Sequence, residues 1–381
     1  MQNLFSVIIK NDRKIVIFLC NPRLILSVFV TSNVKYLKGV CQNMLNLGII
    51  GTNWITHEFV EAALKSEEYQ LTAVYSRHEA KARRFADHYS NAGELLLFTD
   101  LEAFFQSSEI DVVYIASPNS LHYEQAKKAM EAGKNVIVEK PIASNSRELK
   151  ELINLSEDKE VFMFEAARHL HEVNFQTVKK LLAEDKSKII GANLTFMKYS
   201  SRYDAYLEGT NPNIFSATYS GGALMDLGVY LIYAAVDWFG RPDEVVYFDR
   251  KLDTGVDVMG TLIFRYPTFD VTMMTGKHAN SYLPSEIYLT DGTIRLDAVN
   301  SIEEILYEKR KSDGTVEHSL AVQPEENPMI DEARAFSQII THPYGVKEQK
   351  RYQDWIGLCR EVHEIMTTIR EQNDIVFEAD K

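Results

Sequence analysis

The sequence has few cysteines, no long N-terminal apolar run and no excess of basic residues. Its three cysteines, Cys20, Cys41 and Cys359, are too few and too scattered for a disulfide framework, and they lack the spacing of a zinc site. The apolar runs Ile15–Cys20 and Leu24–Val30 fall far short of the ~20 residues that cross a membrane. A net charge of -13 does not attract nucleic-acid phosphates. We therefore expect no metal, no membrane partner, no nucleic-acid partner and a reducing cytoplasmic compartment.

Residues 1–44 differ in charge from the rest of the chain. They carry a net charge of +5, so that the remaining residues carry -18. The basic start is weak and Asn21-Pro22-Arg23 interrupts the apolar stretch, which argues against a secretory signal. An anchoring or targeting arm is one interpretation. We favour an atypical extension that is non-native or poorly ordered, with Met44 as a candidate start of translation.

The remaining residues have the composition of a globular protein. The chain of 381 residues is 45% hydrophobic and 25% charged, which excludes a disordered or fibrous protein. At ~150 residues per domain, this length indicates two or three domains.

Short apolar strands and amphipathic helices alternate over residues 45–164. Leu45–Ile50 is rich in branched residues, and a tight turn joins it to a helix expected over Thr56–Lys65. This alternation is typical of an α/β domain and predicts a Rossmann, doubly wound parallel sheet. The further expected strands are Leu71–Tyr75, Asp111–Ala116, Asn135–Val138 and Val161–Phe164, and the further helices are Glu79–Tyr89, His122–Ala132 and Arg147–Ser156.

Unusual residues gather at the ends of these strands. They form four clusters, at Gly51–Ile55, Ser76-Arg77, Ser117–His122 and Glu139–Pro141. Because ligands of doubly wound sheets bind beyond the carboxyl ends of the strands, the coincidence predicts a ligand site at this edge.

The first turn reads Gly51-Thr52-Asn53-Trp54-Ile55-Thr56, where dinucleotide-binding proteins usually have G-x-G-x-x-G/A. Such a turn could hold a pyrophosphate on backbone N–H groups and a helix N-terminus. Only the first glycine is present. Asn53 tolerates left-handed backbone angles, but its side chain crowds the phosphate. A turn that binds no ligand explains this motif equally well.

Ser76-Arg77 follows the second strand, where enzymes that prefer NAD carry an acid for the ribose 2′-hydroxyl. A hydroxyl and a guanidinium suit a 2′-phosphate instead, which arginine can bind with two hydrogen bonds. We therefore expect NADP(H) to be favoured, with NAD(H) as the alternative. A solvated surface arginine is the competing interpretation.

Three motifs follow one another along the chain, Gly48–Thr52, Ser117-Pro118-Asn119-Ser120-Leu121-His122 and Glu139-Lys140-Pro141. Together they resemble the signatures of the Gfo/Idh/MocA oxidoreductases, which are a Gly-rich first turn, (Thr/Ser)-Pro-Asn-x-x-His and Glu-Lys-Pro. The resemblance continues at Gly221–Tyr230 and covers roughly residues 45–381. Many members end this last motif in His, whereas Tyr230 is similar to the glucose–fructose oxidoreductase and dimeric dihydrodiol dehydrogenase branch.

The strand-end clusters and the resemblance together give a set of cofactor-binding residues. By the resemblance, Asn119 lies near the nicotinamide ribose, and His122 caps or orients its helix rather than transferring protons. Val173 stands where many relatives have Pro. The expected cofactor-binding residues are Gly51, Thr52, Asn53, Trp54, Ile55, Ser76, Arg77, Ser117, Pro118, Asn119, His122, Glu139, Lys140 and Arg168.

The strand–helix alternation stops after Phe164. Residues 165–381 are expected to form an α+β domain with a largely antiparallel open sheet, since turn signals such as Asp291-Gly292 separate several short strands. One face of this sheet would cover the nicotinamide, and the other would pair subunits in a homodimer or higher homo-oligomer. The expected strands are Ile189–Tyr199, Val245–Asp249, Val258–Tyr266, Phe269–Gly276, Ser285–Thr290, Thr293–Asp297 and Ile305–Lys309; the helices are Val173–Leu182, Met329–Ile340 and Asp354–Arg370.

Lys140, Asp226 and Tyr230 are the candidate catalytic residues. Lys140 ends a buried strand at the ligand edge, and its charge would stabilise a Tyr230 phenolate. Asp226 and Tyr230 are four residues apart, hence neighbours on one helix face. We interpret Tyr230 as general acid/base, Lys140 as its electrostatic partner and substrate-oxygen donor, and Asp226 as an orienting group. Without the family resemblance, a capping aspartate and a packed tyrosine would be preferred.

These residues predict an NAD(P)-dependent oxidoreductase that moves a hydride between nicotinamide and a small-molecule sugar, polyol or dihydrodiol-like alcohol or carbonyl. The alternatives are a catalytically inactive dinucleotide-binding sensor or transcriptional co-regulator of the same fold, and a structural protein that binds no cofactor. Arg202, Tyr203 and Tyr206 are candidate pocket residues. His169 or His171 faces the substrate, with a solvated histidine as the equal alternative.

Overall fold

The computed structural model describes residues 5–10, 13–18, 27–30, 44–89 and 94–381. Internal contacts divide the chain into two units, Met1–Met44 and Leu45–Lys381. The division falls at the end of the extension that differs in charge from the rest of the sequence. Whether this extension is native stays a prediction.

The smaller unit contains three antiparallel strands in the order β1-β2-β3. They are β1 (Phe5–Lys10), β2 (Arg13–Phe18) and β3 (Ser27–Val30). The two apolar runs of the sequence overlap β2 and β3, since β-branched residues favour paired strands. The prediction that residues 1–44 are poorly ordered stays a prediction, because most of these residues lie outside the described ones.

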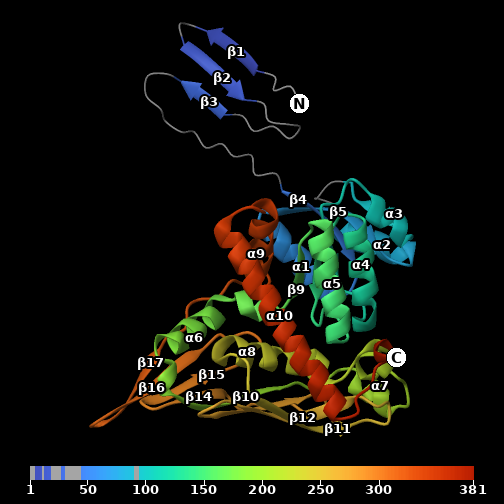
Figure 1. Cartoon of the computed structure of the whole chain (residues 1–381). Helices are drawn as coiled ribbons and strands as arrows, with labels where there is room; N and C mark the ends of the chain where they lie inside the picture. The colour runs from blue at the N-terminus through green and yellow to red at the C-terminus, as the bar shows by residue number, and fades with distance from the viewer. Residues whose placement is uncertain (1–4, 11–12, 19–26, 31–43, 90–93) are drawn as a thin grey trace. The chain divides into compact units, whose positions relative to one another are not determined.

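The first sheet of the larger unit has six strands in the order β6-β5-β4-β7-β8-β9 (Figure 1). All neighbours are parallel. This is the Rossmann order, in which the direction of winding reverses between β4 and β7 and leaves a ligand crevice there. The strands are β4 (Leu45–Ile50), β5 (Tyr69–Tyr75), β6 (Leu96–Phe98), β7 (Val112–Ile115), β8 (Asn135–Glu139) and β9 (Met163–Ala166). The predicted doubly wound sheet is confirmed, although the short β6 was missed.

Helices cover both faces of this sheet (Figure 1). Two of them begin at side-chain caps of the expected kind: Asp100 accepts a hydrogen bond from the Ala103 N–H, and Asn145 accepts one from the Glu148 N–H. The helices are α1 (Trp54–Lys65), α2 (Glu79–His88), α3 (Leu101–Gln106), α4 (His122–Glu131) and α5 (Ser146–Lys159).

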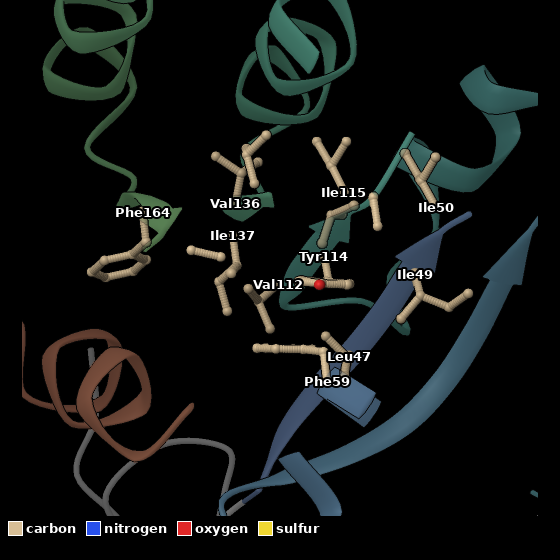
Figure 2. Packing of buried hydrophobic residues seen from close by; sticks show 14 of the residues in the cluster. Leu47, Ile49, Ile50, Phe59, Val112, Tyr114, Ile115, Val136, Ile137 and Phe164 are labelled. Atoms are coloured by element: carbon tan, nitrogen blue, oxygen red, sulfur yellow. The ribbon is translucent and has the colours of Figure 1, made fainter. Parts of the chain in front are cut away.

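Fully buried side chains from neighbouring strands form the core between sheet and helices (Figure 2). The strands are almost continuously apolar because both faces of the sheet are covered. Phe59 of α1 stacks on Tyr114 of β7, with ring centres 3.9 Å apart. The core anchors the strand ends at which the polar residues lie. Its members include Leu47, Ile49, Val112, Val136, Ile137 and Phe164.

The second sheet has eight strands in the order β11-β12-β13-β10-β14-β15-β16-β17. All neighbours are antiparallel except β10 and β13, so the predicted, largely antiparallel sheet is confirmed. The strands are β10 (Ile189–Met197), β11 (Glu244–Lys251), β12 (Asp257–Arg265), β13 (Asp270–Gly276), β14 (Ser285–Leu289), β15 (Gly292–Leu296), β16 (Ile305–Lys311) and β17 (Gly314–Ser319). Its helices are α6 (Val173–Glu184), α7 (Tyr203–Leu207) and α8 (Val229–Phe239).

The last two helices, α9 (Ile330–Thr341) and α10 (Val346–Gln372), connect the two sheets. Phe336 of α9 and Ile356 of α10 belong to the core of the first sheet, whereas Val362 and Ile369 of α10 belong to that of the second. Figure 1 shows α10 running between them. The predicted boundary after residue 164 gives each domain one continuous stretch of sequence. It therefore does not place α9 and the first part of α10 with the first sheet, to whose core they contribute.

Candidate active site

Gly51 opens the turn between β4 and α1 with a backbone that only glycine adopts easily. Its φ is +103°, and a Cβ atom there would lie 2.6 Å from the carbonyl oxygen of Ala116. Nearby, the hydroxyl of the buried Thr56 has no hydrogen-bond partner among the described residues. The turn thus packs closely against the residue after β7, and it has an unpaired donor at the start of a helix, where phosphates commonly bind.

The other residues of this turn differ in their exposure to solvent. Asn53 precedes α1 with φ -92° and ψ 175°, which is extended, so its tolerance of left-handed angles is not used here. The helix begins at Trp54, two residues earlier than predicted, because an extended N-cap suffices to start it. Trp54 is 73% exposed, whereas Ile55 packs against the core. Thr52 is half-buried between Gly51 and Asn53.

Ser76 and Arg77 follow β5 at the same edge of the sheet. The Ser76 N–H donates to the Phe98 carbonyl oxygen at 3.1 Å, and its hydroxyl oxygen accepts from the His78 N–H at 3.3 Å. The Arg77 side chain is exposed. The backbone of this loop is thus held by hydrogen bonds, and it presents a cation to solvent beside the end of β5.

The Ser117–His122 segment ties several strand ends together. His122 lies buried at the start of α4, with Nδ1 2.8 Å from the Pro141 carbonyl oxygen and Nε2 2.8 Å from that of Ser117. Burial lowers its pKa, against the two carbonyls. The Asn119 amide donates to the Ser220 carbonyl oxygen at 3.0 Å, across to the second half. Pro118 precedes the short 3₁₀ turn. His122 thus holds the ends of β7 and β8 in register.

Lys140 and Asp226 lie in direct contact. Lys140 follows β8, and Asp226 lies in a π-helical turn, Leu224–Gly228, that leads into α8. Lys140 Nζ donates to the Asp226 carbonyl oxygen at 2.8 Å and to Oδ1 at 3.0 Å. Lys277, just beyond β13, donates to Oδ2. One carboxylate therefore joins two lysines whose side chains are 12% and 6% exposed.

This contact sets the charges of the three groups. Burial disfavours charge on Asp226, but the adjacent Lys140 and Lys277 outweigh it and hold the pKa of Asp226 well below its ordinary value. Burial also disfavours charge on Lys140 and lowers its pKa, but the neighbouring groups, above all Asp226, raise this pKa by more. The pKa of Lys140 therefore lies above its ordinary value. Asp226 and Lys140 are therefore both charged at neutral pH.

Tyr230, in the first turn of α8, lies directly beside Lys140. The ammonium nitrogen is 4.8 Å from the centre of the phenol ring. Burial raises the pKa of Tyr230, and the charges of Lys140 and Arg168 oppose that rise without cancelling it. The ring also packs on His169, with centres 4.8 Å apart, and on Phe196. The predicted pair is thus in contact, through the ring face.

Arg168 and Glu139 lie behind Tyr230 in a buried charged cluster that includes acids missed in the sequence. Arg168 Nη1 lies 2.6 Å from Glu172 Oε1. Glu139 accepts from the Tyr114 hydroxyl, and burial raises its pKa despite Lys140. Glu332 of α9 is fully buried, its carboxylate has no hydrogen-bond partner within the described segments, and burial raises its pKa strongly. Glu332 is distant in sequence, and no motif marked it.

Two histidines and three pocket residues were further candidates for the site. His169 is 1% exposed, so the alternative of a solvated histidine does not hold at this position. His171 packs edge-on against Trp355, with 4.6 Å between ring centres. Arg202 lines a cavity of about 490 Å³ beside α7. Tyr203 stacks on Tyr206, with centres 5.8 Å apart. This loop reaches Lys277, whose carbonyl oxygen accepts from the Ser200 N–H.

A second cluster gathers metal-binding residue types, although no metal was expected. Glu165 of β9 contacts Cys359 and His363 of α10, and Tyr233 of α8 also donates to it; we call these four residues the Glu165 cluster. Cys359 and His363 are four residues apart within the helix expected over Asp354–Arg370, but Glu165 is distant from them in sequence, and no motif marked the three together. In the structure their polar atoms are occupied by hydrogen bonds to the Glu165 carboxylate.

Comparison with known proteins shows which family the chain matches. Residues 45–166 match the model of an oxidoreductase family with an NAD-binding Rossmann fold, and residues 175–295 match the GFO/IDH/MocA C-terminal domain. The chain is 39% identical over 338 residues to scyllo-inositol 2-dehydrogenase (NADP(+)) IolU of Bacillus subtilis, which covers 89% of this chain and 100% of that protein. It is 29% identical to trans-1,2-dihydrobenzene-1,2-diol dehydrogenase of Danio rerio over 263 residues, 67% of this chain and 75% of the other.

Solved structures share the fold. KijD10, a 3-ketoreductase from Actinomadura kijaniata, superposes with a TM-score of 0.75 at 21% identity, over 86% of this chain and 98% of that one. Levoglucosan dehydrogenase gives a TM-score of 0.72 at 21% identity, over 87% and 97%. The two family models and the full-length relative, taken with the Rossmann order of the first sheet, show that the chain belongs to the Gfo/Idh/MocA family of oxidoreductases.

Proposed function

We propose that the chain is an NADP(H)-dependent dehydrogenase of a sugar, polyol or diol, with Tyr230 as general acid/base and Lys140 as its electrostatic partner. The observation that carries the proposal is the Lys140 ammonium 4.8 Å from the Tyr230 ring centre while bonded to Asp226. The names of relatives support the reaction class, since they include dehydrogenases of scyllo-inositol and of D-xylose that use NADP(+).

The strand-end residues fit a dinucleotide. Gly51 allows the tight turn between β4 and α1, and the unpaired hydroxyl of buried Thr56 lies near it at the start of the helix, where a pyrophosphate would bind. Exposed Arg77 can pair with a 2′-phosphate, which supports NADP(H) over NAD(H). A bound nicotinamide would supply the hydride acceptor or donor.

The residues of this chain would transfer the proton of the substrate hydroxyl. For alcohol oxidation, the Tyr230 oxygen must take the hydroxyl proton, so its phenolate form is the active base. The Lys140 and Arg168 charges favour that form, in opposition to burial. Lys140 can also donate to the substrate oxygen while Asp226 holds its ammonium in place. Because Lys140 is charged, it stabilises negative charge that develops on this oxygen.

The experiment is a comparison of wild type with Tyr230→Phe on a panel of polyols, sugars and diols, with scyllo-inositol first and both NADP⁺ and NAD⁺. We expect NADP⁺-dependent turnover by the wild type and a loss of roughly 10² to 10⁴ in kcat for Tyr230→Phe, with NADP⁺ affinity retained. Unchanged kcat in Tyr230→Phe would remove the assigned role. NADP⁺ binding by the wild type without turnover of any substrate would favour a dinucleotide-binding sensor.

The outer face of the second sheet supports a homo-oligomer. Phe248, Thr261, Met274 and Thr195 lie in one row across four strands, by the pairing register. Phe248 is 62% exposed and Met274 is 37% exposed, so this row carries apolar surface. Light scattering after size-exclusion chromatography tests the proposal, and Phe248→Lys should convert the oligomer to monomers. A cytoplasmic location stays a prediction.

A further inference from the structure

Glu165 contacts both segments that carry the proposed catalytic pair. Its side chain is 3% exposed. Oε1 accepts a hydrogen bond from the Ile142 N–H at 3.2 Å, and Oε2 accepts one from the Tyr233 hydroxyl. Ile142 lies two residues after Lys140, and Tyr233 lies three residues after Tyr230 in α8. One carboxylate therefore joins the Lys140 segment to the Tyr230 helix.

The same carboxylate is held from a third side by α10. Cys359 Sγ donates to Oε2 at 3.0 Å, and His363 Nε2 lies 3.0 Å from Oε2. These two side chains are one turn apart on the helix, so they approach Glu165 together. Since α10 packs in the cores of both sheets, the Glu165 cluster is fixed with respect to both halves of the crevice.

The negative charge of Glu165 is stabilised by the other members of the Glu165 cluster. Burial raises the pKa of Glu165, but His363, Cys359 and Tyr233 lower it further than burial raises it, so the carboxylate is ionised at neutral pH. Hydrogen bonds to an ionised acceptor are stronger than those between neutral groups. A buried carboxylate that accepts from four other residues resists displacement, because each lost donor leaves charge uncompensated.

Tyr230 itself has little to fix its orientation. Lys140 Nζ is bonded to Asp226, but within the described residues no hydrogen bond restrains the Tyr230 hydroxyl, and the ring is held by packing on His169 and Phe196. The Tyr233 hydroxyl is a polar tether one turn further along the same helix. That tether is thus one of the contacts that set the rotation and depth of α8 relative to Lys140, and it is close to Tyr230 in the helix.

We propose that Glu165, through Tyr233 and the Ile142 N–H, is a positioning residue that sets the approach of Lys140 to Tyr230. This inference rests on the proposed function of the pair. It goes beyond that function because Glu165 touches neither the phenol nor the ammonium. A shift of about 1 Å between reacting groups costs up to roughly 10² in rate, so a tether of this kind affects turnover directly.

The primary test is Tyr233→Phe, with Tyr266→Phe as a matched control. Tyr266 is likewise buried, and its hydroxyl donates to the carbonyl oxygens of Ala235 and Gly240 at 3.3 and 3.1 Å, also in or next to α8. Both variants lose one buried tyrosine hydroxyl, and neither changes the charge. We expect kcat to fall about tenfold or more in Tyr233→Phe, with KM and NADP⁺ affinity within twofold, and to stay within twofold in Tyr266→Phe.

A second readout does not depend on turnover. The phenol pKa of Tyr230 can be followed by NMR with tyrosine labelled at ¹³Cζ, assigned by the missing signal in Tyr230→Phe. Lys140 and Arg168 lower this pKa, while burial, Glu139 and Asp226 raise it. We expect the pKa to rise in Tyr233→Phe, because the ring moves away from Lys140, and not to change in Tyr266→Phe.

Three results would overturn the proposal. The first is an unchanged Tyr230 pKa in Tyr233→Phe and Glu165→Gln. The second is an equal loss of kcat in Tyr233→Phe and Tyr266→Phe. The third is a stoichiometric metal in the purified protein that is lost in Cys359→Ser, since the Glu165 cluster would then be a metal site. If the wild type turns over no substrate, the proposed function fails, but the NMR titration still decides the positioning of Tyr230.

Discussion

Lys277 binds the carboxylate oxygen of Asp226 that Lys140 leaves free. Lys140 Nζ lies 3.0 Å from Oδ1, and Lys277 donates to Oδ2. Two cations share one anion, so the group keeps one positive charge next to the Tyr230 ring. In a site largely closed to water, such a charge favours an oxygen that gains negative charge during the reaction.

The two lysines should therefore have unequal roles. In Lys140→Met, kcat should fall by roughly 10² or more, and the rise of alcohol-oxidation rate with pH should move to higher pH. The reason is that the Lys140 charge lowers the pKa of Tyr230, so its removal raises that pKa. Lys277→Met should lower kcat less, since Asp226 keeps its bond to Lys140. Kinetic pH profiles check both.

Lys179→Met is the control for these variants, because Lys179 pairs with Asp237 on the part of α8 away from Lys140. It should leave both kcat and the pH profile within twofold of wild type. A pH profile of Lys140→Met that coincides with that of the wild type would contradict the electrostatic role.

Arg77→Asp should weaken NADP⁺ binding at least tenfold more than NAD⁺ binding, since it replaces a partner of the 2′-phosphate with a like charge. Isothermal titration calorimetry with both cofactors measures the ratio. Arg84→Asp makes the same change of charge at an exposed position of α2 and controls for long-range effects. Equal weakening of both cofactors by Arg77→Asp would remove the basis of the NADP(H) preference.

Gly51→Ala should destabilise the protein more than Gly133→Ala. Both glycines have positive φ, +103° and +77°, but a Cβ at Gly51 would lie 2.6 Å from a carbonyl oxygen, whereas nothing lies within 4 Å of one at Gly133. The shared backbone cost is ~1–2 kcal/mol, and Gly51→Ala adds a clash with β7. Denaturant unfolding should show the difference, and only Gly51→Ala should impair NADP⁺ binding. Equal losses of stability would show that the clash relaxes.

Glu172 should make stability depend on pH. Burial raises its pKa to about 7 in spite of Arg168, from 4.5 when unperturbed. A raised carboxyl pKa contributes stability that is complete below about pH 4.5 and is lost as the pH rises through about 7. Between pH 5 and 8, wild type should therefore lose on the order of 3 kcal/mol relative to Glu172→Gln.

The measurement is the free energy of unfolding from denaturant titrations at both pH values. Glu184→Gln, an exposed position at the end of α6, should follow the wild type at each pH. If Glu172→Gln also runs parallel to the wild type, Glu172 is ionised throughout and Arg168 outweighs its burial.

The sequence determined the Rossmann domain because each of its signals is local. A buried parallel strand reads as a short apolar run, and the polar residues after it lie at the ligand edge whatever the rest of the chain does. Gly51, Ser76-Arg77 and Lys140 could be found in this way. The prediction that Lys140 acts with Tyr230 needed the family resemblance as well, and the bond from Lys140 to Asp226, 86 residues away, came only from the structure.

Only the tertiary structure decided which distant side chains share the buried site. Lys277 follows an ordinary strand, Glu332 lies in a C-terminal helix, and Glu165 gathers donors from α8 and α10. Neither hydrophobic periodicity nor a sequence motif marks such residues. Their role arises because burial removes water, so that the energy of each charge depends on its few neighbours. Those neighbours come from both sheets, and their arrangement is set by packing over the whole chain rather than by any local stretch of sequence.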